Sequence, residues 1–454
     1  MNRYLYLLIE IQKRELDSKI LLALEALNNG YKVAISKKSR LFEKLHIIEP
    51  GIIFLKSFGI KYNIHLDNII NNGHKITGID EEGLQVIRKS ALVEDRFSNK
   101  CLEHLSLLFA WGDYAKKIYN SYALKQKINL KITSCGHPRM DLIKKPLINF
   151  YLKKAKRIKK EYGNYILIAS QFPRYNSMGQ DYNKTSKLRK SISQYKKGSL
   201  YNTAYLIQKK NFYEYEKLYL FLKKRFPKKR FLLLPHPAED LSYYEQFKEK
   251  NSNINVINDI ESIIPYIMSC ETLIAMNCTT SIESFILGKI SINHIPAKNA
   301  KYEFKLPKLL SLNSKSLKNI ENILKKKTYK NKNAISGTNI FEASKILDNL
   351  KHKKSTDIII NGLNSIKIEK KKNTRFKFIL YLYFFLKTKL KNCIYIIFTR
   401  DKFSFKNQIS KRAGLTKANI QNKVNLLSSI NYPGKKYVVK EDYYGLFYIE
   451  KKKY

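Results

Sequence analysis

Short apolar runs alternate with helical patterns along most of this chain. The apolar run Tyr4–Ile9 is followed by the amphipathic stretch Glu15–Asn29 and then by a second apolar run, Tyr31–Ser36. Strands that alternate with helices predict a parallel sheet covered by helices on both faces. The sequence therefore predicts an α/β fold.

The alternation restarts after a basic segment, so it predicts two sheets in tandem. The first block also contains strands expected over Gly51–Lys56, His74–Ile79, Leu105–Trp111 and Lys131–Cys135. The second block contains strands expected over Tyr165–Ser170, Arg230–Leu234, Ile254–Ile257, Thr272–Met276 and Ile290–Ile295. We predict two Rossmann-like domains, residues 1–155 and 156–350, that face a cleft, followed by a basic C-terminal extension, 351–454. Ligands of such sheets bind beyond the carboxyl ends of the strands.

A hydroxyl-rich turn, Asn277–Glu283, follows one strand of the second block and opens a helix. Thr280 and Glu283 have the spacing of a capping box. The free N–H groups of a first helical turn suit a phosphate, and hydroxyl side chains can add hydrogen bonds. Capping boxes also open helices that bind nothing, so a ligand site and a plain helix start are both open here.

Two further turns carry chemistry at strand ends. His236 follows the strand Arg230–Leu234 and precedes Pro237, a residue suited to the first turn of a helix. Three acids, Asp80, Glu81 and Glu82, follow the strand His74–Ile79 and precede Gly83. Neighbouring acids raise one another's pKa, and a carboxylate with a raised pKa can act as a general base. The alternative is that these acids only stabilise the positive end of a helix dipole.

The chain is strongly basic, with 86 Lys and Arg residues against 37 Asp and Glu residues and a formal net charge of +49. Abundant Lys, Ile and Asn are typical of an AT-rich genome, so part of this charge is compositional. No nucleic-acid-binding module is recognisable. Residues 370–412 contain an aromatic run, 378–386, with basic residues on both sides. This pattern predicts either a helix that lies on the surface of an anionic inner membrane or a helix of the protein core.

The remaining composition indicates the compartment. The five cysteines have no CxxC spacing, which argues against a disulfide framework or a zinc site and fits a reducing cytoplasm. Glu10 follows the first apolar run too soon for the apolar region of a signal peptide, and no run of 18 apolar residues is present, so we expect neither a signal peptide nor a transmembrane helix. We expect a bacterial cytoplasmic protein, with attachment to the inner face of the membrane through 370–412 as the open question.

Taken together, the motifs resemble a known group of enzymes. The acidic-acidic-Gly turn, the His-Pro turn and the hydroxyl turn are similar to those of bacterial sialyltransferases and related CMP-sugar transferases of the glycosyltransferase-B fold. The chain resembles more closely the bacterial surface carbohydrate biosynthesis proteins. The matching segments are Arg14–Lys19, Asp80–Leu84, Gly136–Asp141, Leu234–Glu239 and Asn277–Glu283.

The resemblance implies roles for these segments. Glu81 resembles the general base and Glu82 and Asp80 its neighbouring acids, while His236 resembles the histidine that contacts the donor phosphate and assists its departure. The donor-binding residues implied are His236, Pro237, Glu239, Asn277, Thr279, Thr280, Ser281 and Glu283. Arg14, Glu15, Asp17 and Lys19 are expected on the acceptor side or as a helix cap. We interpret Gly136–Arg139 as a structural turn, with a place beside the cleft as the alternative.

The function implied is transfer of Kdo or a nonulosonic (sialic-like) acid from a CMP-activated donor to a glycan or lipid-linked glycan in surface polysaccharide biosynthesis. No cofactor, metal or nucleic acid is expected, and inversion is the simpler outcome because one base suffices. The family usually has Arg where this chain has Leu234. The alternatives are a CDP-glycerol-type polyol-phosphate transferase, a UDP-sugar 2-epimerase-like enzyme, and a non-catalytic scaffold on the membrane surface.

Overall fold

The chain folds into two compact units. The structure is a computed structural model that describes residues 3–84, 92–93, 96–176, 200–236, 238–250, 255–257, 262–297, 303–351, 354–368, 386, 415–442 and 445–452. Unit 1 comprises Met1–Leu84, Arg88–Phe150 and Ser344–Tyr454, and unit 2 comprises Gln85–Ile87 and Tyr151–Ala343. The aromatic run 378–386 and its basic flanks within 370–412 lie outside the described residues, except for Leu386.

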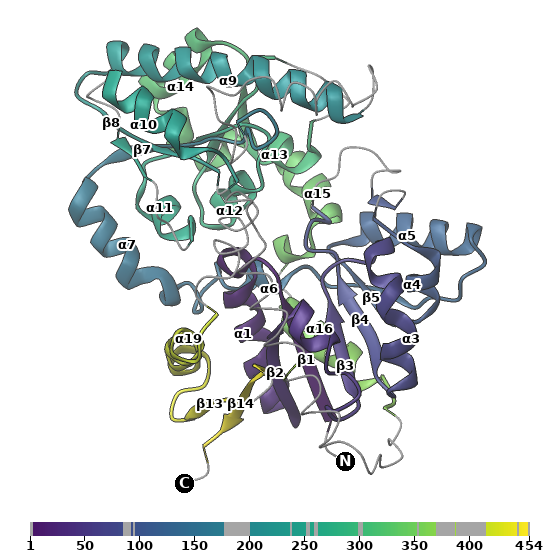
Figure 1. Ribbon diagram of the computed structural model, residues 1–454. Coiled ribbons are helices and arrows are strands. Elements are labelled where there is room, and N and C mark those ends of the chain that lie inside the picture. The colour runs from purple at the N-terminus through teal and green to yellow at the C-terminus, as the bar shows by residue number, and fades with distance from the viewer. Residues whose placement is uncertain are drawn as a thin grey trace. The chain divides into compact units, whose positions relative to one another are not determined.

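Unit 1 is built on an eight-stranded sheet (Figure 1). Its strands are β1 (Arg3–Ile9), β2 (Tyr31–Lys37), β3 (Gly51–Leu55), β4 (Lys75–Ile79), β5 (Leu105–Ala110), β6 (Ile132–Ser134), β13 (Tyr437–Glu441) and β14 (Phe447–Lys451). The order is β13-β14-β2-β1-β3-β4-β5-β6. The six strands β1 to β6 run parallel, while β13 and β14 add an antiparallel hairpin beside β2. The strand order therefore reverses between β1 and β3, where ligands of such sheets bind.

Helices cover both faces of this sheet. They are α1 (Gln12–Asn28), α2 (Lys38–Phe42), α3 (Asn63–Asn71), α4 (Asn99–Glu103), α5 (Asp113–Lys125), α6 (Pro138–Asp141), α16 (Ser355–Asn364) and α19 (Lys417–Asn431). Residues 5–8 of β1 are fully buried, so successive side chains are covered on both faces of the strand. The described parts of 351–454, expected as an extension, belong to this unit.

Unit 2 is built on a six-stranded parallel sheet. Its strands are β7 (Tyr165–Ala169), β8 (Arg230–Leu234), β9 (Asn255–Val256), β10 (Leu273–Ala275), β11 (Ser291–His294) and β12 (Ser311–Ser314). Its helices are α7 (Asn149–Tyr162), α9 (Leu200–Arg225), α10 (Leu241–Lys250), α11 (Ile264–Ser269), α12 (Thr280–Ile286), α13 (Lys305–Leu309), α14 (Leu317–Lys326) and α15 (Gly337–Ile346). The order β12-β11-β10-β7-β8-β9 reverses between β7 and β10, as in a dinucleotide-binding sheet.

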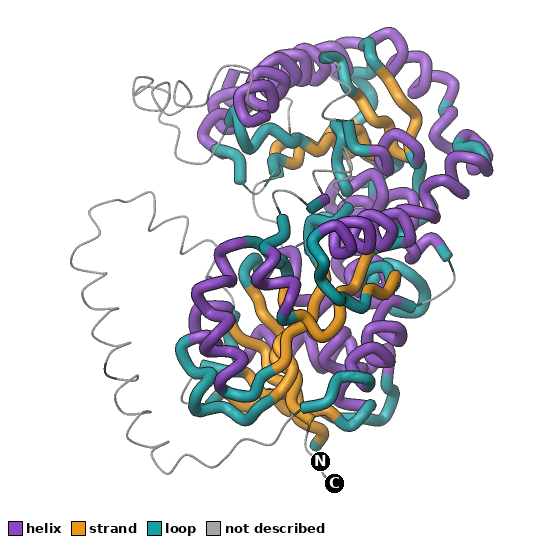
Figure 2. Tube along the Cα trace, turned by 90° about the vertical axis from the view of Figure 1, so that its right-hand side faces the viewer, coloured by secondary structure: helices purple, strands orange, loops and turns teal. Residues whose placement is uncertain are grey.

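The alternation of side chains along β7 explains why unit 2 has a core on each face of its sheet. Ile166 and Ile168 pack with the side chains of α9 and α14 on one face. Tyr165 and Leu167 pack with α7 and α11 on the other face. Figure 2 shows the strands of each unit enclosed by helices. The prediction of an α/β chain with two Rossmann-like units is confirmed.

No helix among the residues that the structure describes is both long enough and apolar enough to cross a lipid bilayer.

Candidate active site

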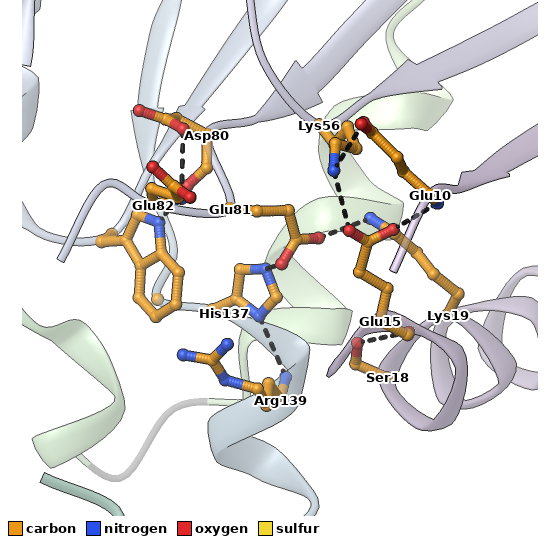
Figure 3. A network of polar contacts seen from close by, with 12 residues as sticks. Glu10, Glu15, Ser18, Lys19, Lys56, Asp80, Glu81, Glu82, His137 and Arg139 are labelled. Atoms are coloured by element: carbon orange, nitrogen blue, oxygen red, sulfur yellow. Dashed lines mark hydrogen bonds and ion pairs between the residues drawn. The ribbon is translucent and has the colours of Figure 1, made fainter. Parts of the chain in front are cut away.

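The ends of five parallel strands in unit 1 supply one cluster of polar side chains. Glu81 follows β4, and its carboxylate lies at the centre of this cluster (Figure 3). One carboxylate oxygen lies 3.0 Å from Lys19 Nζ of α1, and the other lies 3.0 Å from His137 Nε2. The side chains of Glu81 and His137 are 8% and 1% exposed. A charged carboxylate is thus held out of bulk water between a cation and an imidazole.

The pKa of Glu81 reflects two opposing effects. Burial raises the pKa of this carboxyl, but His137 and Lys19 outweigh burial and hold the pKa well below its usual range. Burial lowers the pKa of His137, and the Glu81 carboxylate opposes that shift. The site therefore keeps Glu81 ionised, and the expectation that neighbouring acids raise the pKa of this residue is wrong.

The position of His137 follows from the short segment that carries it. Gly136 has a φ of +79°, and a Cβ there would lie 2.3 Å from Asn349 Oδ1, so only glycine fits. His137 caps α6: its Nδ1 accepts a hydrogen bond from the Arg139 amide at 3.1 Å, and Pro138 occupies the first helical turn. A neutral ring that accepts at Nδ1 carries its proton on Nε2, the atom that faces Glu81.

Our interpretation of Gly136–Arg139 as a turn missed this contact with Glu81. The segment follows β6, two strands away from β4 in the sheet. The signal was the position of a histidine directly after a parallel strand, but the strand order was needed to bring it to Glu81.

The other two acids of the turn, Asp80 and Glu82, form ion pairs with Arg96. Asp80 lies 2.8 Å and Glu82 lies 3.3 Å from Arg96. Burial raises the pKa of Asp80, and Arg96 opposes that shift. Asp80 Oδ1 also accepts the Glu82 amide at 3.1 Å, so these residues shape the turn that presents Glu81.

Gly83 is required by the single tryptophan of the chain. A Cβ at Gly83 would lie 2.6 Å from Trp111 Cδ1. The indole Nε1 donates to the Asp80 carbonyl at 2.6 Å, and the ring stacks on His137 with centroids 4.3 Å apart. One aromatic ring therefore positions both the acidic turn and the histidine.

Of the four residues of α1 that we expected on the acceptor side, two join the Glu81 cluster and two do not. Glu15 accepts from Lys56 Nζ at 2.8 Å, and Lys19 pairs with Glu81, so these two join the cluster. Asp17 instead pairs with Lys423 of α19 at 2.6 Å. Arg14 is half-buried in the first turn of α1.

Lys56 connects the cluster to the point where the strand order of unit 1 reverses. It follows β3, and its ammonium lies 2.9 Å from Glu10, the residue after β1. Glu15 also accepts the Glu10 amide at 2.8 Å. Burial raises the pKa of Glu15, and the negative charge of Glu81 adds to that shift.

In unit 2, His236 lies at the carboxyl end of β8. Its amide donates to Ser170 Oγ at 3.1 Å, and its Nδ1 accepts from the Ala238 amide at 3.1 Å. The ring is thus oriented by its own chain in the same way as His137. Pro237 lies outside the described residues.

Glu239 is fully buried beneath this turn. Its carboxylate accepts from Ser170 Oγ at 2.9 and 3.0 Å and from the Phe172 amide at 2.6 Å, and Tyr244 OH also donates to it. Burial raises the pKa of Glu239 to about 7. Since Ser170 also accepts from His236, Glu239 connects the loops after β7 and β8.

The hydroxyl turn lies where the strand order of unit 2 reverses. With its amide oriented to satisfy both groups, Gln171 after β7 donates to the carbonyls of Met276 and Asn277 after β10, at 2.9 and 3.2 Å. Asn277 has a φ of +47°, and its Oδ1 accepts the Phe304 amide at 2.6 Å. These bonds fix the entry to α12.

The predicted capping box is wrong. Helix α12 begins at Thr280, so its N-cap is Thr279, whose side chain makes no capping bond. Thr280 and Glu283 both lie inside the helix, where the geometry of a capping box is not available. The Thr280 and Ser281 hydroxyls are instead buried and have no hydrogen-bond partner among the residues that the structure describes. Buried polar groups without a partner are rare in proteins, and a bound ligand is one explanation.

Leu234, at the position where the family usually has Arg, ends β8 and packs in the core between the sheet and helices α7 and α11. Within the described residues, no three His, Cys, Asp or Glu side chains gather to hold a metal ion.

Comparison with known proteins gives only distant likenesses. No protein-family model matches the chain, and no curated protein matches it significantly. Among solved structures, it is similar to UDP-GlcNAc 2-epimerase of Neisseria meningitidis bound to UDP-GlcNAc, with 12% identity, a TM-score of 0.49 and coverage of 81% of this chain and 100% of that one.

Two further solved structures match the chain with similar sequence identity, TM-score and coverage. UDP-GlcNAc 2-epimerase of Methanocaldococcus jannaschii has 13% identity and a TM-score of 0.46, and the match covers 80% of this chain and 99% of that one. A variant of the wall teichoic acid polymerase TagF has 11% identity and a TM-score of 0.47, with 80% and 88% covered.

Proposed function

We propose that the protein is a glycosyltransferase that moves Kdo or a nonulosonic acid from a CMP-activated donor to a glycan hydroxyl. The observation that carries the proposal is the buried Glu81 carboxylate, held ionised by Lys19 and His137 at the carboxyl edge of a parallel sheet. The resemblance of the motifs to CMP-sugar transferases supplies the donor class, and the reaction takes place on the cytoplasmic side of a bacterial membrane.

In this reaction Glu81 is the general base. The acceptor oxygen forms a bond to the anomeric carbon of the sugar while the bond from that carbon to the CMP phosphate oxygen breaks. The hydroxyl proton passes to the Glu81 carboxylate, and the electron pair of the broken bond stays on the phosphate. Lys19 and His137 hold the carboxylate still, which preserves its orientation toward the acceptor.

Unit 2 binds the donor in this proposal. His236 and the hydroxyls of Thr279, Thr280 and Ser281 donate to the phosphate, which gains negative charge as the bond breaks. The support for this assignment is that two of these hydroxyls are buried, have no partner within the described part of the chain, and lie where the strand order reverses. The reaction inverts the anomeric centre and uses no metal.

Glu239 has an indirect part in donor binding. Its carboxylate is already occupied by Ser170, Phe172 and Tyr244. We therefore assign Glu239 as a positioning residue that holds the His236 turn.

The test combines nucleotide binding with turnover. Calorimetry with CMP, CDP and UDP is expected to show a preference for CMP that His236→Ala abolishes. Glu81→Gln is expected to keep CMP binding and to lower turnover of CMP-Kdo or CMP-sialic acid by roughly 10²- to 10⁴-fold, the usual contribution of a general base.

Other outcomes would select other functions. Binding of CDP with turnover of CDP-glycerol would indicate a polyol-phosphate transferase, and turnover of a UDP-sugar alone would indicate an epimerase-like enzyme. Failure to bind any of the three nucleotides would indicate a scaffold without catalysis. Near-normal turnover by Glu81→Gln would refute the base assignment whatever the donor is.

A further inference from the structure

Helix α9 is the longest helix of unit 2, and its two faces differ sharply. Its inner face supplies Phe212, Tyr215, Leu218 and Leu222 to the core of the unit. Its outer face carries three apolar side chains that are exposed: Leu206, Tyr213 and Leu220, with 55%, 45% and 47% of their surface accessible. In Figure 1, α9 runs along the outside of unit 2 beside α14.

The exposed apolar residues form a regular stripe. They are spaced seven residues apart, which is close to two helical turns, so they share one face over about 21 Å of helix. Exposed lysines alternate with them along the same face: Lys209, Lys210, Lys217 and Lys224. Of the acids on this helix, Glu214 pairs with Lys217 at 2.8 Å, and Glu216 accepts a hydrogen bond from Tyr243 OH. The stripe therefore combines apolar side chains with a net positive charge.

This pattern does not suit a second copy of the chain. A coiled-coil seam needs apolar residues at two positions of each heptad, and here only one of the two is apolar. The other position is occupied by Lys209 or Lys210, by Glu216 or Lys217, and by Lys223 or Lys224. Pairing two such helices would bring lysine against lysine, which is unfavourable.

We propose that the outer face of α9 binds the surface of an anionic lipid bilayer. Leu206 and Leu220 enter the boundary between headgroups and acyl chains, and the lysines extend to the lipid phosphates. Tyr213, whose hydroxyl lies 2.7 Å from that of Tyr175, places an amphipathic ring at the headgroup level. Aliphatic side chains have no matching role against a nucleic acid, so a membrane fits the stripe better.

The proposal can be tested on the full chain without any turnover. Vesicles of phosphatidylcholine alone are compared in sedimentation with vesicles that contain one-third phosphatidylglycerol. The wild-type chain is expected to bind only the anionic vesicles. Neutralising the stripe in K209Q/K210Q/K217Q/K224Q is expected to weaken binding by roughly a hundredfold to a thousandfold, because each lysine near the surface contributes about fivefold. Leu206→Ser with Leu220→Ser is expected to weaken it by about tenfold.

A matched variant separates the stripe from general charge. K153Q/K156Q/R157Q/K160Q removes the same number of exposed cations from α7 and is expected to bind vesicles nearly as well as the wild type. Equal losses in the two charge variants, or no loss in the leucine variant, would overturn the proposal. The proposal would also be overturned if the α9 lysines bound polyuridylate and the chain did not bind anionic vesicles. Circular dichroism of each variant shows whether it folds.

Discussion

Replacing Lys19 by Met tests whether the ion pair between Lys19 and Glu81 has the energetics of a buried pair. Lys19 Nζ lies 3.0 Å from Glu81, and the two side chains are 3% and 8% exposed. The ammonium also lies 4.7 Å from the Phe54 ring centroid, so a methionine side chain of similar length can pack against the same ring. The substitution therefore removes the charge while it keeps most of the packing.

The expected loss of stability is large for a single side chain. At 3.0 Å and an effective dielectric constant of 20, the Coulomb attraction is about 5.5 kcal/mol. Removing one partner of a buried pair costs about 3–5 kcal/mol, because the other charge stays buried. We expect Lys19→Met to lower the free energy of unfolding of unit 1 by about 3–5 kcal/mol at pH 7.

The loss should depend on pH with a defined sign. In the wild type the pKa of Glu81 is held below its ordinary 4.5, so its stabilising charge is present above that pH and is lost as pH falls through the lowered pKa. Without Lys19, burial dominates and raises the pKa, so the carboxyl protonates in mild acid. The difference between variant and wild type should therefore shrink from pH 7 to pH 5.

The chain provides its own probe and control. Trp111 is the single tryptophan and stacks on His137, so its fluorescence during urea unfolding reports on unit 1. Lys423→Met breaks a more exposed pair, which joins α19 to Asp17 of α1 with 19% and 16% exposure, and should cost about 1 kcal/mol or less. A cost for Lys19→Met that equals the control and does not change with pH would refute the reasoning.

Three further outcomes follow from the geometry. His137→Ala should shift the Trp111 emission and reduce turnover roughly tenfold to a hundredfold, since it removes a contact to a charged group; unchanged emission and turnover would contradict its place beside Glu81. Gly136→Ala should lower the melting temperature more than Gly30→Ala, because both have positive φ but only the first Cβ meets another atom; equal shifts would show that the clash is absorbed. Glu239 has a pKa raised to about 7, above its ordinary 4.5, so it binds more protons when folded; stability should fall as pH rises from about 4.5 to 7, and Glu239→Gln should flatten that dependence in thermal unfolding.

The sequence predicted the local elements well, because their signals are local. The strands β1, β3 and β8 appear within a residue or two of their expected bounds, since each is a short apolar run between turn residues. The placement of Glu81 at the end of β4 follows from the same pattern. The hydroxyl turn was placed correctly between β10 and α12, but its cap was assigned one residue too late.

The contacts that complete the site depend on distant parts of the chain. His137 meets Glu81 because β6 lies two strands from β4, and Asn349 fixes the Gly136 turn from more than 200 residues away. The partner of Asp17 is Lys423, which no periodicity near Asp17 indicates. Strand order and long-range pairing decide these contacts, and a single sequence carries no signal for either.

The C-terminal hairpin has a consequence for how the chain acquires its structure during synthesis. Strand β14 pairs with β2, Lys423 of α19 reaches Asp17, and Asn431 donates to Glu25 at 3.0 Å. Unit 2 has all its residues once the ribosome passes Ala343, whereas unit 1 lacks its outer strands until β13 and β14 have been synthesised. Until then β2 is an edge strand with unpaired backbone groups, a template for unwanted strand pairing. The unit that begins first is therefore the last to finish, and a nascent chain arrested before β13 should be prone to aggregation and a substrate for chaperones.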